Sequence, residues 1–288
     1  MTARLGLRAV ALAYLAALLV LPVGYVFFKT FENGVAPVWE AMTTPQALHA
    51  LWLTVIIALV AVPLNTVFGV LCALVLVRQR FYGKALLNAV IDLPFALSPV
   101  VVGLSLVLVY GRDGWLGGWL TDQGIRIIFA VPGMVLATVF VSLPFVVREV
   151  VPVLREIGVE QEEAAATLGA SPFTTFWRVT LPSVRWGVTY GVVLATARAL
   201  GEYGAVSVVS GKLAGRTETL TLHVEERFQA FDLTAAYTSS VVLAILALLT
   251  LLAMNVFRRG AAPLSSSAVR PAQRASPGVP VPATSEEE

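Results

Sequence analysis

The chain has 288 residues, of which 57% are hydrophobic and only 13% are charged. Charged residues make up about 25% of an average soluble domain, so this composition excludes an ordinary soluble protein and indicates an integral membrane protein. The formal net charge is +2, and the basic residues are scattered among short segments, whereas a nucleic-acid surface would need a concentrated basic patch.

Six windows of the sequence are long and apolar enough for a transmembrane helix, which needs roughly 20 residues. The first follows Arg4 and Arg8, and we interpret it as an uncleaved anchor because no small-residue cleavage site closes it. The expected fold is an all-α polytopic membrane protein with about six transmembrane helices. The windows cover about residues 9–28, 51–77, 86–110, 127–147, 187–209 and 237–257.

The basic residues between these windows predict the orientation of the chain. Under the positive-inside rule, the side with more arginine and lysine is cytoplasmic, and this side includes both termini. It carries Arg4, Arg8, Arg78, Arg80, Lys84, Arg148, Arg155, Arg178, Arg185, Arg258, Arg259, Arg270 and Arg274. The other side carries Lys29, Arg112, Arg126, Lys212, Arg216 and Arg227.

The chain divides into three predicted parts. Residues 1–50 form an N-terminal anchor helix and a periplasmic segment, and residues 51–257 form the transmembrane domain. Residues 258–288 are rich in Ser, Pro and Ala, with too few large apolar residues to offset the entropy of ordering. We predict that this tail is a disordered cytoplasmic segment.

Metal and redox chemistry are not expected. The single cysteine, Cys72, lies in an apolar run, so the chain can form neither an internal disulfide nor a thiolate cluster. The two histidines, His49 and His223, fall outside the apolar runs, which removes the usual metal ligand and general base from the bilayer interior. The sequence therefore predicts no metal site and no catalytic residue.

A polar segment between the fourth and fifth windows is strongly helix-forming. Acidic residues precede Ala164–Ala166, where the helix dipole favours them. Gly169 can adopt the left-handed conformation that ends a helix, and Ser171–Pro172 offers a cap and a first-turn proline for the next one. We predict two short helices joined at an angle, with Leu181–Pro182 ending the second before the membrane.

The predicted hairpin has an apolar side larger than a solvated loop requires, made by Leu168, Phe173, Phe176 and Trp177. One interpretation is a docking surface for another protein. The other is an amphipathic loop that lies on the bilayer.

The spacing of this hairpin resembles the EAA loop of permease subunits from bacterial ABC importers. The motif of this loop is Glu-Ala-Ala, three residues, Gly, nine residues, an aliphatic residue, one residue and Leu-Pro. The residues that match it are Glu163, Ala164, Ala165, Gly169, Leu181 and Pro182, and Val179 stands where isoleucine is more usual. The resemblance implies a type I ABC importer permease fold in which residues of about 160–182 form a coupling helix. It also implies that this helix docks into a groove of a separate ATPase, which Glu163 contacts, with Gly169 as the hinge.

The resemblance extends from about Leu51 to Phe257 and narrows the family to the second permease subunit of sulfate/thiosulfate importers, the CysW type. It is carried by residues 92–101, 110–115, 178–182 and 198–211. Molybdate permeases are similar at Arg198–Gly204 but not at Ser207–Gly211, and a molybdate or tungstate permease is the nearest alternative.

The family implies three kinds of partner: a related permease subunit in a heterodimer, a dimer of ATP-binding subunits and a periplasmic sulfate-binding protein. The chain has no G-x-x-x-x-G-K-[ST] motif, so we expect it to bind no nucleotide cofactor and to have no enzyme activity of its own. ATP and magnesium would be bound by the partner ATPase.

Charged residues inside the predicted spans need partners, because each costs roughly 2.5–3.5 kcal/mol at the bilayer centre on insertion scales. Arg198 and Glu202 are spaced i and i+4, so they can pair on one helix face. This pair is either a structural salt bridge or part of a gate or pathway.

Asp92 precedes Pro94, Ser98 and Pro99 in the third window. The prolines predict a kinked helix near the pathway, where Ser98 or a neighbouring helix would satisfy the freed backbone groups. The alternative is a kink with Asp92 as a cap at the cytosolic interface.

Two further classes of protein fit the sequence less well. An ion-coupled secondary carrier would use Asp92 and Glu202 as proton or sodium sites, but it leaves the Glu163 hairpin unexplained. An intramembrane protease with Ser105 as nucleophile would need a positioned base, and neither histidine is predicted within a span.

Overall fold

The computed structural model describes residues 2–259, and within this range the chain forms helices and connecting loops without strands. The predicted disorder of the tail lies outside the described residues, except for Arg258 and Arg259, which continue the last helix. The elements are α1 (Thr2–Leu15), η1 (Ala16–Val20), α2 (Leu21–Phe31), α3 (Val35–Met42), α4 (Pro45–Arg78), α5 (Lys84–Ala96), α6 (Pro99–Tyr110), α7 (Gly117–Asp122), α8 (Val131–Glu156), α9 (Glu160–Thr167), α10 (Pro172–Thr175), η2 (Phe176–Thr180), α11 (Leu181–Leu200), α12 (Gly204–Val209), α13 (Leu220–Gln229) and α14 (Leu233–Arg259).

Among the described residues, four continuous helical stretches are long and apolar enough to cross a membrane: Gly6–Phe31, Pro45–Arg78, Val131–Glu156 and Leu233–Ala253. A fifth crossing is available if α5 and α6, which meet at 113°, count as one broken span. The predicted span at 187–209 is not a single helix, because α11 ends at Leu200 and α12 begins at Gly204. α11 also carries two charged residues, Arg185 and Arg198.

The kink predicted in the third window is confirmed, and it is a sharp break rather than a gentle bend. Leu97 and Ser98 are extended, and Pro99 starts the next helix. The Ser98 side chain makes no capping hydrogen bond in the described structure, which leaves the other alternative, a neighbouring helix. α6 instead packs on α12, so closely that a Cβ on Gly103 would lie 2.8 Å from the carbonyl oxygen of Ala205.

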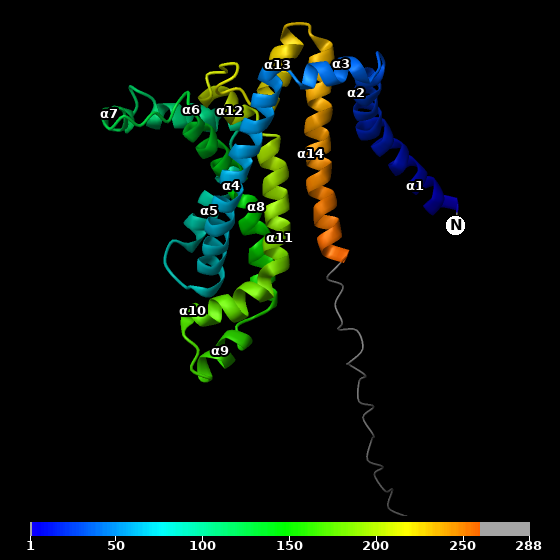
Figure 1. Ribbon diagram of the computed structural model, residues 1–288. Helices are drawn as coiled ribbons and strands as arrows, with labels where there is room; N and C mark the ends of the chain where they lie inside the picture. The colour runs from blue at the N-terminus through cyan, green and yellow to red at the C-terminus, as the bar shows by residue number, and fades with distance from the viewer. Residues whose placement is uncertain (1, 260–288) are drawn as a thin grey trace, which may run out of the picture.

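The core is formed by α4, α8 and α11, which lie side by side in the centre of the molecule (Figure 1). Small residues allow this close packing: a Cβ added to Gly69 on α4 would lie 2.6 Å from a methyl group of Val146, and one on Gly191 of α11 would lie 2.8 Å from the Cα of Val146. Asn65 on α4 is fully buried and donates to Ser142 Oγ on α8 at 2.8 Å. This hydrogen bond links α4 to α8 inside the bundle.

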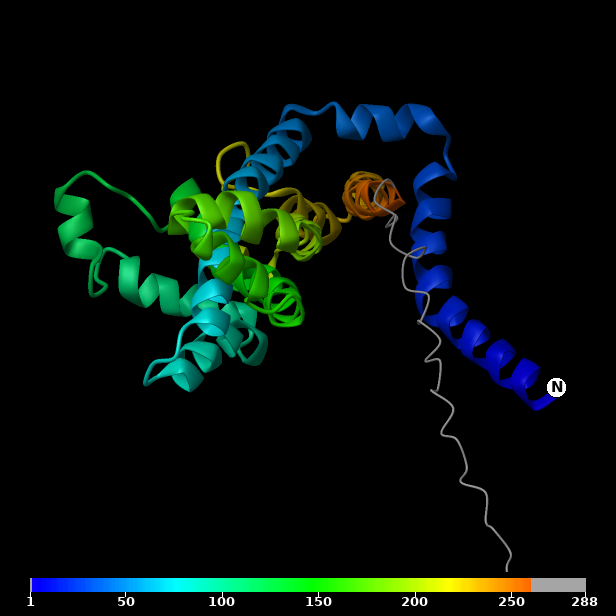
Figure 2. The same cartoon turned by 90° about the horizontal axis from the view of Figure 1, so that it is seen from below.

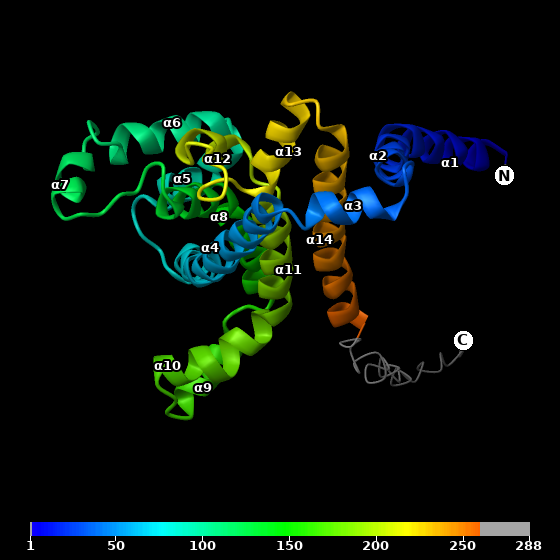
Figure 3. The same ribbon diagram turned by 45° about the horizontal axis from the view of Figure 1, so that its top comes forward.

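The hairpin of α9 and α10 projects from one end of the bundle, and α3 and α13 lie at the opposite end (Figure 1). α6 and α7 extend sideways as an arm, which Figure 3 shows beside α12. On the other side, α14 stands between the central bundle and α2, as the view from below makes clear (Figure 2). The boundary predicted at 50/51 falls within α4, and the boundary predicted at 257/258 falls within α14.

Candidate functional site

The hairpin has the two helices and the turn that the sequence predicted. Three glutamates occupy the first turn of α9, and Gly169 after its end has a φ of +83°. Ser171 caps α10, with its Oγ accepting a hydrogen bond from the Thr174 amide at 3.3 Å, and Pro172 stands in the first turn. Residues that cap and end the two helices therefore determine the shape of this segment.

The expected end of the second helix at Leu181–Pro182 was wrong. α10 continues through the π-helical turn η2 directly into α11, and Pro182 lies in the first turn of α11. Within η2, the Leu181 amide bonds to the Phe176 carbonyl, a step of five residues rather than four. A π turn shifts the hydrogen-bond register, and a proline without an N–H is accommodated where that register changes. The second half of the hairpin is therefore continuous with a long central helix.

The base of the hairpin is held by Arg78, the last residue of α4. Its Nε lies 2.9 Å from Oε2 of Glu162, and its guanidinium donates to the backbone carbonyls of Leu154 at 3.1 Å and Gly158 at 2.6 Å. Thr180 donates to Oε1 of Glu162 at 2.9 Å. Arg78 and Glu162 thus join α4, the end of α8, α9 and η2.

Sequence reasoning missed this contact. Arg78 was considered only as a charge at the end of a span, and 84 positions separate it from Glu162. The signal that was available is an arginine ending an apolar helix on the same predicted side as an acidic helix.

Neighbouring glutamates in α9 have different surroundings. The side chain of Glu162 is largely enclosed, whereas Glu163 is exposed, as are Ala164 and Gly169 beyond it. Ala165 and Leu181 are half-buried, and Pro182 is exposed. The motif residues therefore differ in burial, and Glu163, Ala164, Gly169 and Pro182 are the exposed ones.

The hairpin also carries large apolar side chains that are exposed. Leu168 is 88% exposed, Phe173 74% and Trp177 53%. Phe173 and Phe176 each contact Trp177 edge to face, with ring centroids 6.1 and 5.5 Å apart. Exposed aromatic groups of this kind are common on protein-binding surfaces.

Arg198 and Glu202 form the expected ion pair, with Nη1 and Oε2 2.6 Å apart. Glu202 lies beyond the end of α11, so the two residues do not belong to one helix as predicted. The Glu202 side chain is 1% exposed. Its Oε1 accepts a hydrogen bond at 2.9 Å from the amide of Ala205, which lies in the first turn of α12. Thr221 donates to the Glu202 carbonyl at 2.9 Å. Glu202 thus organises the break between α11 and α12.

Asp92 pairs with Arg148 of α8. Arg148 Nε donates to Asp92 Oδ1 at 2.8 Å, a second nitrogen contacts Oδ2, and Asn88 accepts at 3.3 Å. Asp92 lies inside α5, whose N-cap is Gly83, so the alternative of Asp92 as a helix cap was wrong. The pair is partly exposed, at 40% for Asp92 and 36% for Arg148. The candidate pathway residues therefore fall into two separate groups, since Asp92 links α5 to α8 and Glu202 joins α11 to α12.

Comparison with known proteins agrees with this architecture. Residues 65–264 match the family described as "Binding-protein-dependent transport system inner membrane component". The chain is 53% identical over 253 residues to the "Sulfate transport system permease protein CysW" of Synechocystis sp., covering 88% of this chain and 92% of that protein. It is 50% identical over 236 residues to the protein of the same name from Escherichia coli K12, covering 82% and 81%.

Solved structures share the fold at much lower identity. A bacterial ABC transporter involved in the import of the acidic polysaccharide alginate superposes with a TM-score of 0.75, at 15% identity, covering 90% of this chain and 95% of that chain. The family match covers most of the chain, and the relatives at about half identity cover more than four-fifths of it. The chain therefore belongs to the family of inner membrane components of binding-protein-dependent transport systems.

Proposed function

We propose that this chain is the membrane-spanning permease subunit of an ATP-driven importer that carries sulfate or thiosulfate across the bacterial cytoplasmic membrane. The observation that carries the proposal is the identity of about half to the CysW proteins over nearly their whole length. The chain supplies the passage, and ATP is hydrolysed on a separate subunit, so this chain is not itself an enzyme and binds neither ATP nor magnesium.

The hairpin of α9, α10 and η2 is the proposed contact with the ATPase. Glu163 is the residue that meets the ATPase, and Gly169 provides the turn between the two helices. Support comes from the exposure of Glu163 beside Leu168 and Phe173. Further support comes from the Arg78–Glu162 ion pair, which resists tilting of the hairpin against the bundle.

The proposed orientation places both termini and this hairpin in the cytoplasm, and α13 on the periplasmic side. The basic residues gathered on the hairpin side support it. The remaining partners are a related permease subunit in a heterodimer and a periplasmic sulfate-binding protein. Exposed apolar residues on α2 and α6, such as Phe28, Leu104 and Leu108, require lipid or a second permease to cover them.

Asp92, Ser98, Arg198 and Glu202 are proposed to lie on or to close the passage. Ser98 is exposed at the break between α5 and α6, and Asp92 is partly exposed on α5. Glu202 stands at the other break, between α11 and α12. Breaks in membrane helices are tolerated where they are buried in protein or line a cavity, which supports both positions.

The test is uptake of labelled sulfate by cells that lack this chain, with and without a plasmid copy. Uptake should be lost and then restored, and unlabelled thiosulfate should compete. In inverted or reconstituted vesicles, transport should require ATP and the binding protein and persist when ion gradients are collapsed. Strong competition by molybdate or tungstate alone would instead favour the alternative oxyanion permease, and dependence on an ion gradient would favour a secondary carrier.

A further inference from the structure

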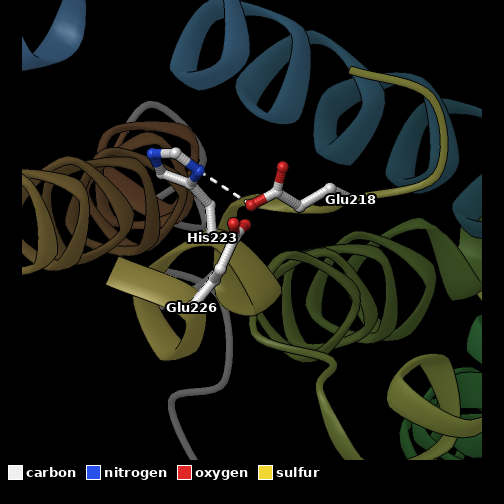
Figure 4. A group of neighbouring side chains, drawn as sticks. All are labelled: Glu218, His223 and Glu226. Carbon is white, nitrogen blue, oxygen red and sulfur yellow. Dashed lines mark hydrogen bonds and ion pairs between the residues drawn. The ribbon is translucent and has the colours of Figure 1, made fainter. Parts of the chain in front are cut away.

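A polar cluster lies at the opposite end of the molecule from the hairpin, outside the membrane-crossing helices. It contains Glu218, in the loop before α13, and His223 and Glu226 on α13 (Figure 4). Glu218 and His223 are buried, with side chains 1% and 2% exposed, and His223 Nδ1 lies 2.8 Å from Glu218 Oε1. Glu226 is 48% exposed, so the cluster can be reached from solvent.

The cluster brings two carboxylates together in a poorly solvated place. Two neighbouring carboxyl groups repel unless a proton or a cation lies between them.

A cation can take the place of such a proton. Oε1 of Glu218, Nδ1 of His223 and a carboxylate oxygen of Glu226 lie close together, whereas Oε2 of Glu218 points away from both neighbours (Figure 4) and has no hydrogen-bond partner within residues 2–259. A divalent cation would neutralise both carboxylates, whereas one shared proton neutralises only one.

The donor set and its spacing fit a small cation. His223 and Glu226 are three residues apart on one helix face, and each of the three residues offers one ligand atom, all within 4.8 Å of one another. Ligand atoms around a tetrahedral zinc ion, at about 2.0–2.1 Å from the metal, lie about 3.3 Å apart. The observed spacings, from 2.8 Å up to at most 4.8 Å, bracket this value.

We propose that Glu218, His223 and Glu226 form a binding site for a divalent cation of the zinc class, with water completing the coordination. His223 binds through Nδ1 and carries its proton on Nε2, so the metal replaces the present Nδ1–Oε1 hydrogen bond. Arg227 opposes the metal, because its guanidinium lies 3.7 Å from a Glu226 oxygen. Both side chains of this pair are partly exposed, and Arg227 can turn toward solvent when the metal binds.

Metal binding would crosslink the loop before α13 to α13 itself. The same segment is already fixed to the bundle, since the Leu220 amide donates to Thr54 Oγ1 of α4 at 2.8 Å. The sequence predicted no metal site. That prediction considered histidine ligands only within the apolar windows, and His223 lies outside them.

The test is calorimetric titration of Zn²⁺ into the full-length protein in lipid nanodiscs, purified without a polyhistidine tag and stripped of metals with EDTA. We expect one equivalent to bind, with release of protons on binding. Glu226→Gln should weaken binding by at least about tenfold, because it removes a charged ligand at an exposed position. Thermal unfolding without metal will show that this variant is folded.

Glu225→Gln is the matched control. Glu225 is the adjacent acid on α13, but it bonds to Lys212 at 2.7 Å and not to the cluster. Its substitution should leave the zinc affinity unchanged. The proposal is overturned if the wild-type protein binds no zinc, if Glu226→Gln binds it equally well, or if both variants weaken binding alike.

Discussion

Arg78 at the end of α4 and Glu162 in the first turn of α9 form an ion pair, with Nε and Oε2 2.9 Å apart, that fixes the hairpin to the bundle. Arg78→Met should free the hairpin, because Glu162 loses its cation and the carbonyls of Leu154 and Gly158 lose their donor. A hydrogen bond to a charged group contributes about 1.5–3 kcal/mol, so local opening of the hairpin should become at least about tenfold more frequent.

Hydrogen–deuterium exchange of the amides in residues 159–180 measures this opening. Arg80→Met is the control, because Arg80 is exposed and its substitution removes the same charge from a position two residues away. Equal exchange in the two variants would show that the ion pair does not hold the hairpin.

Glu163→Arg should leave the protein folded and inserted but break the coupling between ATP hydrolysis and sulfate uptake. The reason is that Glu163 is exposed on the hairpin surface, so the change reverses a charge at the proposed contact with the ATPase without disturbing an internal bond. The measurement is the number of ATP molecules hydrolysed per sulfate imported in proteoliposomes.

Glu160→Arg is the control for Glu163→Arg. Glu160 lies in the same first turn and is also exposed, so both variants lose the same helix-dipole interaction of about 0.3–1 kcal/mol. Normal coupling in Glu163→Arg, or equal loss in both variants, would count against the assignment of Glu163.

Gly169→Ala should destabilise the hairpin through the backbone alone. A Cβ at Gly169 would meet no atom within 4 Å, but the φ of +83° is unfavourable for alanine by about 1–2 kcal/mol. Gly169→Asn should cost less, because asparagine adopts the left-handed region more readily.

Exchange of the hairpin amides and coupled uptake report the effect of these substitutions. Gly118→Ala is the control, because a Cβ there also meets nothing within 4 Å and φ is not positive. If the three variants behave alike, the turn at Gly169 does not depend on its backbone conformation.

Glu202→Gln should lower the stability of the folded protein by about 3 kcal/mol, because it leaves Arg198 without its buried partner. Glutamine can still accept the Ala205 hydrogen bond, so the loss reports the ion pair and not the start of α12. Thermal unfolding of Glu202→Gln, Arg198→Met and the double variant gives the coupling energy.

The double variant should recover most of the lost stability. Sulfate leakage without ATP in that variant would identify the pair as a gate, whereas tight, ATP-dependent transport would identify it as structural. A single variant as stable as the wild type would contradict the buried pairing.

The parts of the fold that follow from local chemistry were predictable. Gly169, Ser171 and Pro172 end one helix of the hairpin and start the next. They are close together in the sequence, so the shape of the hairpin could be inferred from sequence neighbours alone. The Arg78–Glu162 contact could not be inferred, because it depends on how α4 and α8 end in space.

Two other expectations failed for physical reasons. The window at 187–209 is apolar on both sides of Gly201, so hydropathy conceals a break that depends on the side-chain bonds of Glu202. Pro182 usually signals the end of a helix, but the π turn before it removes the conflict. Composition reveals neither tertiary hydrogen bonds nor a change of helical register.

The uninterrupted path from η2 into α11 has a mechanical consequence. α11 has 20 residues, so it is a stiff rod about 30 Å long, with Trp177 just before its start and Gly201 just after its end. In the proposed coupling, a neighbouring subunit that displaces Trp177 would move the far end of α11 by a similar distance, because no loop interrupts the helix between them. A movement that opens the passage on one side of the membrane could therefore start on the opposite side.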